Sequence, residues 1–286
     1  MKQATRVIRE LGYQPDLTGG YLTLSPSAPW GLAAYASVID NVTNDPRTLL
    51  PQSRLGSWFL ASSARASGAG GSFYTTDLAV LNLSTVEADM TLQFLGHDSD
   101  GRDGPSRRLA LAPKSSISYR DVLKTVFGLE SGYGAIRIAS SSGEVIMQSQ
   151  TSTPGAGGTF GQSVPQVPSF ITSDNRHFIS SIREDSSFRT NLILANAAET
   201  SVDVDLLLIS SEGETLGTKR VTLPPLGMTQ ITRVVRAFGV TAQIRGARLA
   251  LSTATSTGLV AAYASTIDNI ANDPRTLLPR GSLKFH

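Results

Sequence analysis

Apolar and polar residues alternate in short runs along most of this chain, and the alternation predicts β-strands. GAIRIAS at residues 134–140 and GARLALS at residues 246–252 place Ile or Leu on one side and small or polar residues on the other. Strict alternation over about five residues is typical of a strand with one buried face. GYLTLS at residues 20–25 has the same pattern, so we expect a third such strand there.

A second group of strands is predicted twice, in the same order. Each set begins with an apolar run that ends in Asn, continues through a strand, a polar turn and another strand, and closes with a short alternating stretch. The matching order indicates two units built on one plan. The sets are YTTDLAVLN (74–82), MTLQFLG (90–96), RLALAP (108–113) and SSISYR (115–120), then FRTNLILAN (188–196), VDLLLIS (204–210), RVTLPP (220–225) and MTQITR (228–233).

Three segments break the alternation with apolar residues at helical spacing followed by glycine. They are TRVIRELG, DVLKTVFG and TRVVRAFG, at residues 5–12, 121–128 and 232–239. Apolar residues three and four apart favour a helix, and glycine ends one because it adopts a left-handed conformation without strain. We therefore expect three short helices.

One long phrase occurs almost unchanged at two places. AAYASVIDNVTNDPRTLLP at residues 33–51 returns as AAYASTIDNIANDPRTLLP at residues 261–279, which is 228 positions later. Half that separation, 114, leads to a degraded third copy, QTSTPGAGGTFGQSVP at residues 150–165. A fixed period indicates a tandem array. The two full copies predict a strand and then a turn built from Asp, Asn and Pro.

The period divides the chain into a half unit, residues 1–54, and two full units, residues 55–167 and 168–286. Roughly seven short strands per period, with turn signals every 8–12 residues, are typical of an immunoglobulin-like sandwich of about 100 residues. A propeller blade needs only about 40–50 residues. The predicted fold class is all-β: tandem immunoglobulin-like antiparallel β-sandwiches with a period of 114 and one short helix per repeat.

The half unit leaves one part of a sandwich without its complement. Three interpretations stay open: the chain is a piece of a longer array, the half is completed by a neighbouring subunit through strand addition, or the half packs against its own neighbours. The tail GSLKFH, with Leu283 and Phe285 alternating, is a candidate added strand, and a frayed terminus is the alternative.

Composition narrows the function classes. Of 286 residues 17% are charged, the net charge is +2, and no long basic run is present, so we expect no nucleic-acid partner. Cysteine is absent, which excludes disulfides and thiolate metal sites. No apolar stretch is long enough for a secretory signal or a membrane span. If the protein is exported, its signal lies outside this chain.

Catalytic signatures are weak. The three histidines are His97 in an expected hairpin turn, His177 in an expected linker between units, and His286 at the last position. No HExxH, GxSxG or Walker pattern accompanies them. Gly-rich stretches at residues 66–72 and 155–158 do not join a strand to a helix start as a phosphate-binding loop would. We therefore expect no enzyme and no resident cofactor.

Calcium is the one ligand that the sequence suggests. HDSDGRDG at residues 97–104 places Asp98, Asp100 and Asp103 around a glycine, and calcium prefers carboxylate and carbonyl oxygens that converge from a tight loop. A solvated hairpin turn is the alternative interpretation.

A second calcium candidate is the turn of the repeated phrase. Its acids are Asp40 and Asp45 in the first copy and Asp268 and Asp273 in the second. Capping of backbone groups by these side chains explains them without an ion. Arg47 and Arg275, which follow the turn proline, are candidates to bridge those carboxylates.

The repeated motifs also resemble those of a known class. T-[DN]-L-x-x-x-N at residues 76–82 and 190–196, with the closing YAS-x-IDN and NDPRT, resembles the tandem Ig-like repeats of large secreted or surface proteins of environmental bacteria. The resemblance implies an extracellular or cell-surface location and a structural or adhesive role, and it carries over no catalytic residue. The middle copy at residues 150–165 lacks the tyrosine and the Asp-Asn pair, so these are not essential to the fold.

These observations favour a non-enzymatic extracellular module that serves as a stalk, spacer or fibre subunit and assembles with itself or with neighbouring repeats. The alternative function is a carbohydrate- or surface-binding adhesion module with a cell-surface polysaccharide as partner. Sugar-binding sandwiches usually expose a row of aromatic residues, whereas Trp30 and Trp58 lie near unit junctions.

Overall fold

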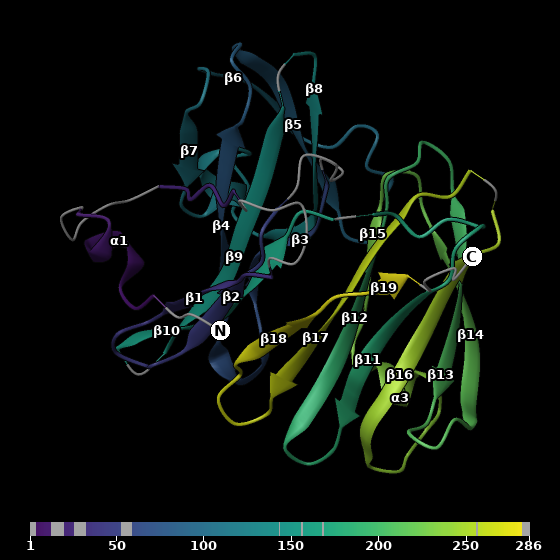
Figure 1. Cartoon of the computed structure of the whole chain (residues 1–286). Coiled ribbons are helices and arrows are strands. Elements are labelled where there is room, and N and C mark those ends of the chain that lie inside the picture. The colour runs from purple at the N-terminus through teal and green to yellow at the C-terminus, as the bar shows by residue number, and fades with distance from the viewer. Residues whose placement is uncertain are drawn as a thin grey trace.

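A computed structural model shows an all-β protein of antiparallel strands with short helical turns (Figure 1). It describes residues 4–12, 20–25, 33–52, 59–142, 144–155, 157–167, 169–255 and 257–281. The predicted tail at Leu283 and Phe285, and both tryptophans, lie outside these residues.

The first sandwich is formed by one 8-stranded sheet that folds over on itself. Its order is β10-β9-β4-β3-β8-β5-β6, with β7 paired to β4. The hairpin ends of β3 and β4 pair with each other and join the two layers, and buried residues of both layers share one core. The strands are β3 (Phe59–Ser67), β4 (Phe73–Asn82), β5 (Ala88–Gly96), β6 (Ser106–Leu111), β7 (Ser116–Tyr119), β8 (Gly132–Ser140), β9 (Val145–Gly155) and β10 (Gly158–Pro165).

The second sandwich has two separate sheets, β14-β13-β16-β11-β19 and β15-β12-β17-β18. Leu192 and Leu194 of one sheet pack with Leu206 and Leu208 of the other in a single buried core, so the sheets lie face to face. The strands are β11 (His177–Glu184), β12 (Phe188–Asn196), β13 (Val202–Ile209), β14 (Thr215–Leu223), β15 (Met228–Ile231), β16 (Ile244–Thr253), β17 (Val260–Asp268), β18 (Pro274–Leu277) and β19 (Arg280–Gly281).

A third core joins the two sandwiches. Phe59 and Leu95 of the first sandwich are buried against Ile193, Met228 and Tyr263 of the second. In β12, successive side chains therefore enter different cores, one within its own sandwich and one between the sandwiches. This explains why β12 is a continuous apolar run and not an alternating one.

The N-terminal half unit contributes α1 (Val7–Glu10) and the hairpin of β1 (Ala36–Ile39) and β2 (Pro46–Leu49). This hairpin is a separate two-stranded sheet beside β10, drawn in dark purple in Figure 1. Its register pairs Ala36 with Leu49, and β17–β18 pairs Ala264 with Leu277 in the same way. We call these two the twin hairpins.

The predicted single-turn helices are present as α1, α2 (Val122–Thr125) and α3 (Val234–Ala237). Each begins after a residue with left-handed backbone: Arg6 (φ 53°), Asp121 (φ 47°) and Arg233 (φ 50°). Each is followed by a glycine of positive φ, at positions 12, 128 and 239, which confirms the expected glycine stops.

Two predictions were wrong. Residues 20–25 form no strand, because β16, which shares their pattern, pairs with β11 and β13 on its two edges, and no strand flanks residues 20–25 in the described part of the chain. His177 lies in β11, not in a linker, and is only 4% exposed. The polar pair Ser180–Ser181 interrupts the alternating pattern of this strand, because Ser181 has a φ of 63° and the pairing register shifts there.

The T-[DN]-L-x-x-x-N motif is explained by buried hydrogen bonds. The Thr190 hydroxyl lies 3.0 Å from that of Thr266 on β17, and Thr76 makes the matching contact, 2.8 Å, with Thr151 on β9. Asn196 is fully buried, and its amide donates to two carbonyl oxygens of neighbouring turns, at 2.7 and 2.9 Å. The motif therefore links β12 to its neighbours across the fold.

We expect Asn196→Ala to lower the free energy of unfolding by about 2–4 kcal/mol, because it removes a fully buried side chain and leaves the partly buried carbonyl groups of Thr200 and Pro224 and the N–H of Ala198 without this partner. Urea unfolding followed by circular dichroism measures the change. Thr222→Ala, which removes an exposed hydroxyl bonded to Asp203, is the control and should cost less than about 1 kcal/mol. Equal losses for the two variants would contradict this role.

Candidate functional site

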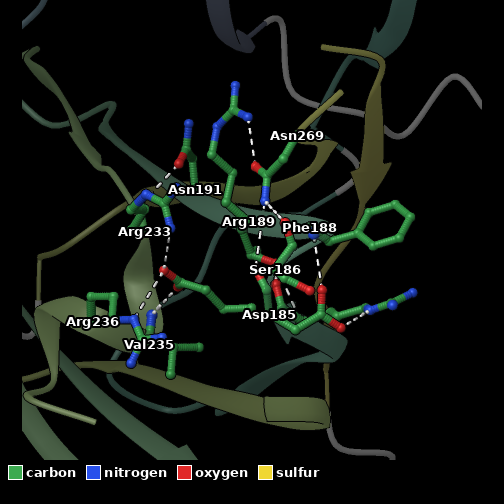
Figure 2. Close-up of polar contacts among 12 residues, drawn as sticks. Asp185, Ser186, Phe188, Arg189, Asn191, Arg233, Val235, Arg236 and Asn269 are labelled. Carbon is green, nitrogen blue, oxygen red and sulfur yellow. Dashed lines mark hydrogen bonds and ion pairs between the residues drawn. The ribbon is translucent and has the colours of Figure 1, made fainter. Parts of the chain in front are cut away.

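The end of β11 carries two acids that hold other elements in place, and we call this pair the acidic corner. Glu184 is fully buried, and its Oε2 accepts the backbone N–H of Val235 in α3 at 3.1 Å. Its Oε1 lies 3.4 Å from Nη1 of Arg233 and 3.8 Å from Nε of Arg236 (Figure 2). A buried carboxylate needs such partners, so this contact fixes α3 against β11.

Asp185 completes the acidic corner. Its Oδ1 accepts the N–H groups of Ser187 and Phe188 at 2.8 and 2.9 Å, and its Oδ2 accepts Nε of Arg183 and of Arg245 at 2.8 and 3.1 Å. Burial alone would raise the pKa of Asp185, but the bonds from Arg183, Ser187 and Phe188 lower it to about 2. The carboxylate is therefore charged at neutral pH and fixes the β11–β12 turn.

Strand β12 adds contacts to the start of α3 and to the turn between β17 and β18. Asn191 accepts the backbone N–H of Arg233 at 3.0 Å, and Arg189 donates to the side-chain oxygen of Asn269 at 2.8 Å (Figure 2). Arg189 also donates to the side-chain oxygen of Asn272 at 3.1 Å. The hairpin β11–β12 thus binds α3 through its acids and the β17–β18 turn through Arg189.

The first sandwich also joins its hairpin to the start of its helix by an ion pair, with the charges exchanged and from the neighbouring strand position. There the strand residue is Arg65 on β3, and it forms an ion pair with Asp121, the left-handed residue before α2. Ala66 and Ser67 follow Arg65 in SSARAS, where Glu184 and Asp185 follow Arg183 in SSIRED. Each hairpin therefore carries a charge opposite to that of its own helix start and equal in sign to that of the helix start in the other sandwich.

The predicted turn acids Asp40 and Asp268 cap backbone groups. Oδ1 of Asp40 accepts the N–H groups of the second and third residues after it at 2.9 and 3.0 Å, and Asp268 does the same at 2.7 and 2.9 Å. These bonds lower the pKa of both carboxyls. Asp40 also accepts the N–H and hydroxyl of Thr159 on β10, at 3.1 and 3.0 Å.

The other two turn acids lie near each other where the twin hairpins meet β10. Asp45 is 5% exposed, and its Oδ2 accepts the N–H of Gly161 at 3.0 Å and Nε of Arg47 at 3.4 Å. Asp273 has a buried Oδ1 with no hydrogen-bond partner among the described residues. Burial, and next the charge of Asp45, raise the pKa of Asp273 to about 6.

The predicted 97–104 turn contacts the second sandwich. Oδ1 of Asp98 accepts the Thr229 hydroxyl at 2.6 Å. A Cβ on Gly101 would lie 2.0 Å from the carbonyl oxygen of Leu226, so glycine is required there. Asp100 binds Arg102 through both oxygens, and Asp103 is exposed. Within the described residues no group of three or more His, Cys, Asp or Glu side chains is placed to hold a metal ion.

Comparison with known proteins finds no matching family model, no matching curated protein and no matching solved structure. None of the helices in the described part of the chain is long and apolar enough to cross a membrane. The candidate site is therefore defined by its geometry alone. Inspection of single motifs missed the acidic corner, but aligning SSARAS with SSIRED would have shown its two additional acids.

Asp273 predicts a pH dependence of stability. Its folded-state pKa of about 6 lies above the ordinary value of 3.8, so the folded protein keeps this proton to higher pH than the unfolded chain does. Stability is therefore lost as the pH rises from about 4 to about 6. Asp273→Asn removes that loss. We expect its melting temperature, relative to the unaltered protein, to rise over this window and to stay higher at pH 7.

Asp268→Asn is the matched control in the same turn. Backbone N–H groups of Ala271 and Ile270 lower the pKa of Asp268, so its charged form stabilises the fold above the unfolded pKa of about 3.9. This variant should melt lower at pH 7, with a difference that vanishes as the pH falls. A difference between Asp273→Asn and the unaltered protein that does not change with pH would contradict the assignment.

We expect calcium added to chelator-treated protein to give no binding heat and no change in melting temperature. The turn acids Asp40 and Asp268 already accept backbone N–H groups, and in the 97–104 turn Asp98 bonds to Thr229 while Asp100 bonds to Arg102. Isothermal titration and a thermal melt measure both quantities. A saturable heat that Asp100→Asn or Asp40→Asn abolishes would instead establish the calcium site suggested by the sequence.

Proposed function

We propose that this protein is a non-enzymatic extracellular structural module that assembles by β-strand pairing with another repeat or subunit. The observation that carries the proposal is the free edge of β1. Strand β17 pairs with β12 on one edge and β18 on the other, whereas β1 pairs only with β2 in the described part of the chain. Tyr35 is 72% exposed, and its counterpart Tyr263 is 3% exposed.

The β1 edge lacks the features that prevent strand addition elsewhere in the molecule. The end strand β6 carries Arg107 and Arg108, and the end strand β14 carries Lys219 and Arg220, since charges on an edge oppose pairing with another chain. The sequence of β1 is ASVI, without charge or proline, and all of it is exposed. Val38 and Ile39 of β1, and Val42 in the turn after it, are more than one-third exposed, which favours a protein contact.

The rest of the molecule suits a structural role. The core shared by the two sandwiches buries residues of both, so the sandwiches form one stiff unit and not a flexible pair. Immunoglobulin-like repeats with a period of 114 and an extracellular location complete the proposal, supported by the repeated phrase and by the resemblance of its motifs.

We expect concentration-dependent association of the chain in light scattering, because free strand edges pair with each other when no better partner is present. Val38→Lys, which places a charge on the β1 edge, should abolish the association. Val86→Lys is the control, because Val86 is 54% exposed and lies in the turn between β4 and β5. A chain that stays monomeric at every concentration and binds polysaccharides on a glycan array would overturn the proposal in favour of a carbohydrate-binding module.

A further inference from the structure

We propose, resting on the assembly function above, that the N-terminal half unit binds a hairpin of the β11–β12 type from another repeat or subunit, in which that hairpin has no β17-type strand of its own. The partner has an acidic Glu-Asp corner and an Arg-Thr-Asn-Leu strand, and it adds to the free edge of β1. The β3–β4 type, which lacks the acids, is disfavoured. The second sandwich holds residues 261–279, its own copy of this segment, with such a hairpin.

The backbone of β1 matches that of β17, which shows how the edge is covered. AAYASVID at residues 33–40 differs from AAYASTID at residues 261–268 only at Val38. In the second sandwich, β12 pairs Ile193 with Tyr263 and Leu192 with Ala264. The same register on β1 would cover the exposed Tyr35 with an apolar strand.

Valine at position 38, where the second copy has Thr266, leaves no polar group of the partner strand without a hydrogen bond. Thr190 of β12 loses the hydroxyl contact that Thr266 provides, but its hydroxyl still donates to the carbonyl oxygen of Arg183 at 2.6 Å. A β12-type strand therefore tolerates valine at this position.

The turn between β1 and β2 keeps the two asparagines that, in the turn between β17 and β18, accept hydrogen bonds from Arg189. Asn41 and Asn44 occupy the positions of Asn269 and Asn272, and Asn44 and Asn272 share a φ of 56°. Within the described residues no hydrogen bond reaches the side chain of Asn41 or Asn44, whereas both counterparts accept from Arg189. The first turn thus presents amide oxygens for an arginine that the partner strand supplies.

The helix start of the half unit specifies the charge of the partner. Arg6 and Arg9 of TRVIR correspond to Arg233 and Arg236 of TRVVR, which both lie within ion-pair distance of Glu184. Arg6 has the same left-handed backbone as Arg233. Arg6 and Arg9 are exposed, and neither forms an ion pair among the residues that the structure describes.

The apolar side of α1 is only partly covered. Val234 and Val235 of α3 are fully buried, whereas Val7 and Ile8 of α1 are partly exposed. A hairpin with Glu184 would cover this face and pair Arg6. A hairpin of the β3–β4 type has Ala66 and Ser67 in place of the two acids, so it would place Arg65 near Arg6 without the acidic corner. Its one acid, Asp77, accepts the backbone N–H at the start of α2.

The test is binding of two labelled peptides to the full chain, followed by fluorescence anisotropy. The probe spans residues 177–197, which contain β11 and β12, and the matched control spans residues 59–82, which contain β3 and β4. We expect saturable binding of the probe and at least tenfold weaker binding of the control. The probe should also prevent the concentration-dependent association of the chain, because it occupies the β1 edge.

Charge reversal tests the specificity. Arg6→Glu, an exposed substitution, should weaken binding of the probe at least tenfold without changing the melting temperature, and a probe with Glu184→Arg should restore binding to this variant. Absence of probe binding, or equal binding of both peptides irrespective of residue 6, overturns the inference. If association through β1 persists in that case, the proposed function stands while the assigned partner is wrong. A chain that is monomeric with or without Val38→Lys and binds no probe refutes both.

Discussion

The structure depends on pairing between β12 and β17, and on the matching pair β4 and β9 in the first sandwich. Side chains of β12 enter a core on each of its faces, so its backbone N–H and C=O groups have no access to water and must be paired along the strand. Strand β17 satisfies one edge and β15 the other. The threonine and asparagine of the repeated motif reinforce this pairing at both ends, since each is fully buried and hydrogen-bonded to a neighbouring element.

The need to pair both edges of a strand also applies to the N-terminal hairpin of β1 and β2. Residues 33–40 match residues 261–268 at all but one position, yet β1 has only one paired edge within the described residues, while its turn is held by Thr159 and Gly161 of β10. The hairpin is thus fixed to the rigid body of the two sandwiches on one side and open on the other. A strand that is held in place loses less conformational entropy when another strand pairs with it, which favours association at that edge.

Exchange of charge between the sandwiches suggests how matching halves are selected. Arg65 pairs with Asp121 and Glu184 pairs with Arg233, so each hairpin is joined to the start of its own helix by an ion pair of opposite polarity, from strand positions one residue apart. Similar backbones would otherwise let either hairpin pair with either helix segment. A like-charge contact in a partly buried place opposes the wrong combination, so the ion pairs contribute specificity where surface pairs in general contribute little stability.

Alternation and turn residues in the sequence determined most of the strands, the three glycine-stopped turns and the twin hairpins, because these depend on neighbouring residues. The sequence also determined that Asp40 and Asp268 cap their turns, since an aspartate reaches backbone groups two and three positions away. Tertiary structure alone decided that Asp45 and Asp273 lie near each other, that the 97–104 turn contacts Leu226, and that residues 20–25 form no strand. Each of these results depends on which distant segment lies alongside, and a strand with a suitable pattern forms only where another strand pairs with its backbone.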